Sequence, residues 1–235
     1  MQIDKAWYQK TGLVNPLIAF YFFLAVINII AEYHQDHNFF SYTKPFIILF
    51  LVLIYILTAK TKNKFYLVSL FLAIFSNLFL TLNGDSYPIV ANGFLFLFQL
   101  SIIYVIMQKM KFPGIALCTI SSLPFVTLSF LVFLVIYEKH GPVSYLFLLE
   151  AILIAFAGSL ALANFLMKYN KANSHLFYGM VLLSSSQLLF ILANTFTNNK
   201  LLVPLTSFSF VLGHYFLYKF VISKEKHRRK YKLVQ

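Results

Sequence analysis

Two short polar pairs interrupt apolar stretches of the chain and are the first candidates for chemistry. They are Ser76-Asn77 and Ser186-Gln187. An amide side chain carries donors and an acceptor, so it can orient a water molecule or the polar head of a ligand, but it cannot transfer a proton at neutral pH. We expect both stretches to be helices that face one interior cavity, with the two amides where the chemistry would occur.

Glu150 is the one carboxylate well inside an apolar stretch. A buried carboxyl group can act as a general acid or carry a proton. It can also be a packing residue that is protonated or hydrogen-bonded to a neighbour, and both interpretations stay open. His214 has two similar interpretations, a contact to a ligand and a hydrogen bond between helices.

The composition indicates that the elements that position these side chains are embedded in a membrane. The chain has 235 residues, of which 60% are hydrophobic, 19% aromatic and only 11% charged. A water-soluble domain carries about 25% charged residues, so most of this surface must face lipid. The net charge is +12, but the basic residues lie in short segments between apolar stretches, which is the pattern of membrane topology. We therefore expect no nucleic-acid partner.

The apolar stretches divide the chain into eight segments of the length that crosses a membrane, which is about 20 residues. We predict an all-α polytopic membrane protein whose residues 1–235 form a single transmembrane domain with a basic cytoplasmic tail at 223–235. The eight expected transmembrane helices cover residues 13–31, 44–59, 65–82, 87–108, 113–137, 142–167, 174–196 and 201–222.

The distribution of basic residues predicts the orientation. With eight crossings, 16 of the 19 Lys and Arg residues fall on one side of the membrane and three on the other. Positive residues gather on the cytoplasmic side, so we expect both termini in the cytoplasm and a multi-pass protein of the inner membrane. The basic tail is then a topology anchor, and it can also contact anionic lipid.

An internal repeat is a further hypothesis. An offset of 110 residues places Ser76-Asn77 on Ser186-Gln187. Two halves of four helices would insert with the same orientation, giving a 4+4 parallel repeat. The alternative is a chance likeness between apolar helices.

Depth in the membrane brings the candidate residues together. In the predicted topology the helices that carry Asn77 and Gln187 run outward, and the helix that carries Glu150 runs inward. At about 1.5 Å per residue, the three side chains lie roughly 8–14 Å below the outer boundary. We expect them to line one cavity.

Several of these residues stand at spacings that resemble the pattern of a known family. That pattern opens the second helix with Lys-Pro, and here the residues are Lys44-Pro45. Its third helix carries Gly-Asp and, three residues later, Leu. The corresponding residues here are Ser76-Asn77 and Leu80.

The fourth and seventh helices add to the resemblance. The family's fourth helix has Gly, then His eight residues on and Tyr three further on; here these are Gly93, Ser101 and Tyr104. Its seventh helix has Gly followed seven residues later by Ser-Asp, and here Gly179 precedes Ser186 by seven. Over about residues 42–220 the chain resembles a divergent member of the lysoplasmalogenase (YhhN-type) family.

The resemblance implies a fold of eight helices and a hydrolase that cleaves the vinyl-ether bond of a membrane lysophospholipid. The sequence contains no nucleotide-binding or strict metal-ligand motif, so we expect no cofactor and no metal. Vinyl-ether hydrolysis needs a proton for carbon and a water for the resulting oxocarbenium ion, and paired carboxylates suit it. Both family aspartates are amides here, Asn77 and Gln187, so Glu150 is the candidate acid and the amides would position the head group or the water. The expected substrate contacts are Lys44, Ser76, Ser101, Tyr104, Ser186 and His214.

Two other function classes stay open. The neutral amides at both acid positions suit a protein that binds or transports a lipid or another amphiphile without chemistry. A structural membrane subunit would use the same polar residues only for hydrogen bonds between helices, each of about 0.6 kcal/mol on average.

Overall fold

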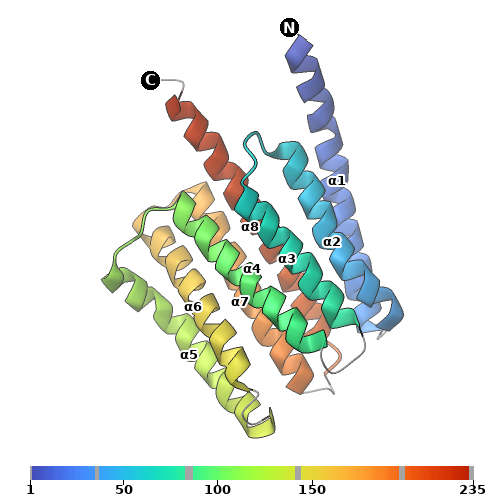
Figure 1. Cartoon of the computed structure of the whole chain (residues 1–235), viewed down its shortest axis with the longest axis vertical. Coiled ribbons are helices and arrows are strands. Elements are labelled where there is room, and N and C mark those ends of the chain that lie inside the picture. Colours follow the sequence, from blue (N-terminus) through green and yellow to red (C-terminus); the bar gives the residue numbers. More distant parts are fainter. Residues whose placement is uncertain (1, 35–36, 83–86, 141–143, 196–198, 233–235) are drawn as a thin grey trace. The chain divides into compact units, whose positions relative to one another are not determined.

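The computed structural model describes residues 2–34, 37–82, 87–140, 144–195 and 199–232, which form eight α-helices and no strand (Figure 1). The all-α fold is therefore confirmed for the described residues. The helices are α1 (Gln2–Tyr33), α2 (His37–Thr58), α3 (Lys64–Thr81), α4 (Tyr87–Lys109), α5 (Ile115–His140), α6 (Ser144–Met167), α7 (Lys171–Thr195) and α8 (Leu202–Lys232).

The eight expected helices coincide with the eight observed ones. For α3 to α7 the described ends differ from the expected ends by three residues at most, and residues 142–143 and 196 lie outside the described part. The larger differences are at α1, which begins at Gln2, at α2, which begins at His37, and at α8, which continues to Lys232. Pro16 therefore lies inside α1 rather than in a first turn. Hydropathy detects only the lipid-embedded part of a helix, whereas Lys, Arg, Gln and Glu are good helix formers and extend it.

Six of the helices contain segments long and apolar enough to cross a membrane. The apolar segments Thr43–Thr58 and Lys64–Leu80 are shorter than 18 residues. The six long segments support a membrane-embedded helical protein. Eight crossings and the 4+4 repeat stay predictions.

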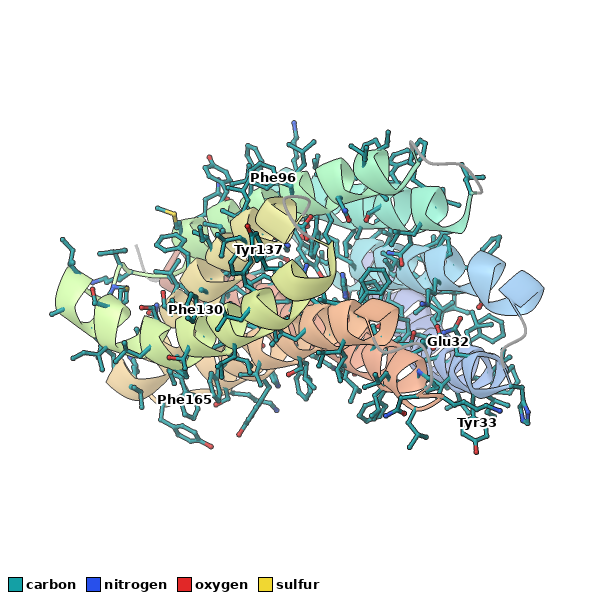
Figure 2. The ribbon with its side chains drawn as sticks, turned by 90° about the horizontal axis from the view of Figure 1, so that it is seen from below. Glu32, Tyr33, Phe96, Phe130, Tyr137 and Phe165 are labelled. Carbon is teal, nitrogen blue, oxygen red and sulfur yellow. The ribbon has the colours of Figure 1, made fainter. Side chains whose placement is uncertain are left out.

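The outer side chains agree with a lipid environment. Large apolar and aromatic side chains project outward along the helices, among them Tyr33, which is 50% exposed, and Phe130, which is 54% exposed (Figure 2). Isolated apolar residues are ordinary on a soluble surface, but extended apolar patches mark contact with a membrane or a partner. Helices suit such a surface because they satisfy their backbone hydrogen bonds internally.

The chain forms two compact units, Met1–Phe98 with Val221–Gln235, and Gln99–Phe220. In the first unit α1 packs on α2, and α2 packs on α3. The contact between α1 and α2 includes two polar links. The Thr43 hydroxyl donates a hydrogen bond to Oδ1 of Asn28, and Nζ of Lys44 lies 2.8 Å from Oε1 of Glu32, whose side chain is fully buried.

A tyrosine joins α2, α3 and the end of α8 within the first unit. The buried Tyr55 hydroxyl donates to Oε1 of Glu225 at 2.8 Å and accepts from the backbone N–H of Asn63 at 2.7 Å. The Asn63 side chain in turn caps α3 by accepting from the N–H groups of Phe65 and Tyr66. This network fixes the start of the basic segment of α8 against the connection between α2 and α3.

Tyr55→Phe is expected to lower the free energy of unfolding by about 1 kcal/mol, because a hydrogen bond contributes about that much net. A double-mutant cycle with Glu225→Ala in detergent micelles tests the network. The double variant should be less destabilised than the sum of the two single variants, because both remove the same link. Additive effects would show that the Tyr55–Glu225 bond does not contribute.

In the second unit α5 packs on α6 and α7, and α6 packs on α7. Small residues allow close contacts between membrane helices, and Ala155, Ser159 and Ala163 of α6 are buried accordingly. At Gly158 an added Cβ would lie 2.6 Å from the Phe125 ring of α5, so a side chain there would require that ring to move.

Two glycines also bring α7 and α8 close together. An added Cβ at Gly179 would lie 3.1 Å from the backbone nitrogen of Leu217. An added Cβ at Gly213 would lie 2.8 Å from Cγ of Leu183 and 3.1 Å from its backbone nitrogen. The two helices run in opposite directions, so Gly179 and Gly213 fix their register.

Candidate functional site

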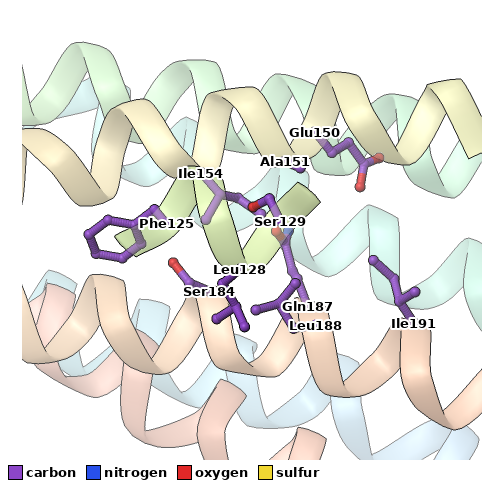
Figure 3. A pocket seen from close by; sticks show the side chains of 10 residues that line it. All are labelled: Phe125, Leu128, Ser129, Glu150, Ala151, Ile154, Ser184, Gln187, Leu188 and Ile191. Atoms are coloured by element: carbon purple, nitrogen blue, oxygen red, sulfur yellow. The ribbon is translucent and has the colours of Figure 1, made fainter. Parts of the chain in front are cut away.

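A pocket in the second unit lies where one face of each of α5, α6 and α7 meets the others (Figure 3). On α7 the lining residues include Ser184, Gln187 and Ile191, which follow one another at three and four residues and so lie on one helix face. The face of α6 is set in the same way by Glu150 and Ile154. Helical spacing puts each set of residues on one face of its helix. The packing of α6 on α7 then brings the Glu150 carboxyl group and the Gln187 amide into the same pocket.

The α5 side of the pocket contributes a mixture of apolar and polar groups. Phe125, Leu128 and Ser129 line it at helical spacing. Phe125 lies at one end of the pocket and Glu150 near the other, toward Ile191 (Figure 3). Leu128 is 47% exposed, so the pocket opens toward the lipid-facing surface beside α5.

Two polar side chains of the pocket have unused hydrogen-bonding capacity. Within the described residues Glu150 is buried and makes no hydrogen bond or ion pair. Oε1 of Gln187 is also buried, without a hydrogen-bond partner in that part of the chain. The Ser184 hydroxyl donates to the Met180 carbonyl at 2.7 Å, which leaves its oxygen able to accept from a group in the pocket.

The pocket has the size and chemistry of a water site. Its volume is about 30 Å³, enough for roughly one or two water molecules, which need two to four polar partners each. Glu150, Gln187, Ser129 and Ser184 supply a carboxyl, an amide and two hydroxyls. A carboxyl group beside a held water is an arrangement that can deliver a proton and then accept one.

The structure brings together two of the three expected catalytic residues, Glu150 and Gln187. Asn77 belongs to the first unit, where its Nδ2 donates to the carbonyl of Ala73 at 2.8 Å. Its preceding neighbour Ser76 is buried. A cavity shared by Asn77 and the other two residues stays a prediction.

The other expected substrate contacts are spread over several helices. Among the described pocket residues none of Lys44, Ser101, Tyr104, Ser186 and His214 is present. Lys44 is paired with Glu32, and Tyr104 is 45% exposed on α4. Ser101 is half-buried on α4, and Ser186 is buried on α7. His214 is buried on α8 with Nδ1 3.0 Å from the Phe210 carbonyl, so Nδ1 carries its hydrogen.

Two pocket residues, Ser129 and Ser184, were not predicted from the sequence. Ser184 precedes Gln187 by three residues, and this spacing indicates a shared helix face. Ser129 carries no comparable signal, because its place depends on how α5 packs against α6 and α7.

Comparison with protein-family models, with curated proteins and with solved structures finds no match for the chain.

Proposed function

We propose that the protein is a lysoplasmalogenase-like membrane hydrolase that acts on a vinyl-ether lysolipid at the pocket between α5, α6 and α7. The observation that carries the proposal is a buried Glu150 that shares a water-sized pocket with Gln187. Glu150 is the acid, and Gln187 and Ser184 orient the water. The pocket itself is too small for a lysolipid, so the substrate lies along the lipid-facing side at Leu128 and only its vinyl ether reaches the polar groups.

The chemistry proceeds in balanced steps. The Glu150 carboxyl proton adds to the vinyl carbon remote from oxygen, which leaves an oxocarbenium ion at the other carbon. The held water attacks that carbon and loses a proton to the Glu150 carboxylate, so the acid is restored. The resulting hemiacetal breaks its bond to the ether oxygen, and its hydroxyl proton moves to that oxygen. The products are a fatty aldehyde and a glycerophospho-alcohol.

Release of fatty aldehyde tests the proposal. Purified protein in bicelles is expected to produce aldehyde from 1-alkenyl lysophosphatidylethanolamine and none from the saturated 1-alkyl analogue, because only the alkenyl group forms the oxocarbenium ion by protonation. Aldehyde production no greater than in bicelles without protein would rule out hydrolysis.

A second candidate is binding of the same lipid without turnover. It is favoured by the amides at residues 77 and 187, where the resembling family has aspartates. Lysolipid that co-purifies with the protein and is identified by mass spectrometry, in a preparation that releases no aldehyde, would support this candidate over the hydrolase.

For its setting, we propose eight membrane crossings in an inner membrane with both termini in the cytoplasm. The support is the excess of basic residues, 16 of 19, on one side. An ether-lipid substrate would reside in the membrane that surrounds the protein. This agrees with a pocket that opens toward the lipid-facing surface beside α5.

A further inference from the structure

Positive charge and aromatic rings gather at one end of the contact between α7 and α8, outside the α5–α6–α7 pocket. Gly179 faces Leu217 at this contact. Because the helices are antiparallel, one turn toward the start of α7 is opposite one turn toward the end of α8. His175 lies one turn before Gly179 on α7, and Lys171 lies one further turn before it. Lys219 lies two residues after Leu217 on α8, toward the same end of the contact.

The rings form a wall around these basic groups. The Phe216 ring centroid lies 5.9 Å from that of His175 and 5.9 Å from that of Tyr178. Nζ of Lys219 lies 5.1 Å from the ring centroid of Tyr215, which is a cation–π distance. Tyr178 is half exposed, so the wall reaches the outer surface of the helix pair.

The two charges that act on His175 are both positive. Lys171 and Lys219 both lie close enough to His175 to act on it electrostatically. Residues 151–224 contain no Asp or Glu. Nδ1 of His175 is buried and has no hydrogen-bond partner within the described residues. A negatively charged group with acceptor oxygens would neutralise the lysines and accept from the imidazole.

We propose that Lys171, His175 and Lys219 bind the phosphate of an anionic phospholipid, with Tyr178, Tyr215 and Phe216 contacting its glycerol and upper acyl chains. Lys171 is at the first residue of α7 and its side chain is exposed, which is the level of lipid head groups for a membrane-crossing helix. Basic pockets between membrane helices bind such head groups, and aromatic rings are enriched at that level. The exposed apolar rim selects a lipid over free phosphate.

Native mass spectrometry of the delipidated full-length protein tests the site. Titration with phosphatidylglycerol is expected to give a saturable single-lipid adduct, while phosphatidylcholine binds at least tenfold more weakly. Lys171→Gln and Lys219→Gln should each weaken phosphatidylglycerol binding by roughly fivefold, the effect of one basic group near anionic lipid. Lys171→Arg should retain it.

Lys111→Gln is the matched control, since Lys111 is an exposed lysine of the same unit on the connection between α4 and α5. Its phosphatidylglycerol binding should equal that of the wild type. Equal losses in all three Gln variants, equal binding of the two lipids, or displacement of the lipid by inorganic phosphate would each overturn the proposal.

Discussion

Glu150→Gln is expected to lower the rate of aldehyde release from alkenyl lysolipid by at least about 100-fold, because a positioned general acid contributes about 10²- to 10⁴-fold. Glutamine keeps the size of the side chain but has no transferable proton. The rate is measured at saturating substrate in bicelles, so that a change in lipid binding does not enter.

Glu225→Gln is the matched control for this change. Glu225 lies in the first unit and bonds to Tyr55, so the same substitution there should leave aldehyde release unchanged. If Glu150→Gln releases aldehyde at the wild-type rate, Glu150 is not the acid. Equal losses in both variants would indicate a general effect on the protein rather than loss of a proton donor.

Gly213→Val is expected to lower the free energy of unfolding by about 2–3 kcal/mol. The new Cβ would lie 2.8 Å from Cγ of Leu183 and 3.1 Å from its backbone nitrogen. The backbone of α7 cannot rotate away as a side-chain end can, so the helices must separate, and overpacking of this kind costs about 1–3 kcal/mol. Unfolding in mixed micelles with added SDS measures the change.

Gly93→Val provides the comparison, because nothing lies within 4 Å of an added Cβ at Gly93. There the change should stay within about 0.5 kcal/mol, the small difference between the helix propensities of Gly and Val. Equal stability of the two variants would contradict the close contact between α7 and α8.

The helices could be predicted from the sequence because each is marked by a long apolar run bounded by polar residues, and six of these runs are long enough to cross a bilayer. The same measure could not find the polar start of α1 or the basic end of α8, since both lie beyond the lipid-embedded length and continue through good helix formers. Gln2 and Lys232 therefore mark ends that hydropathy does not record.

The candidate site could be predicted in part for a similar reason. Glu150 and Gln187 were expected at similar positions along neighbouring helices, and they line one pocket. The place of Ser129 depends on how α5 is rotated against α6, which apolar composition does not specify. The group of Lys171, His175 and Lys219 depends on the register that Gly179 and Gly213 set between α7 and α8, and no short motif encodes that register.

A cryo-electron microscopy structure of the protein with bound 1-alkyl lysophosphatidylethanolamine, the analogue that is not hydrolysed, would show whether the reacting part of the substrate reaches the pocket that contains Glu150 and Gln187. We expect the ether oxygen at the mouth of the pocket beside Leu128. The first carbon of the alkyl chain, which is bonded to that oxygen, should lie within about 3.5 Å of a water held by Glu150 and Gln187. A lysolipid bound on another surface, with the pocket closed by apolar side chains, would contradict the account.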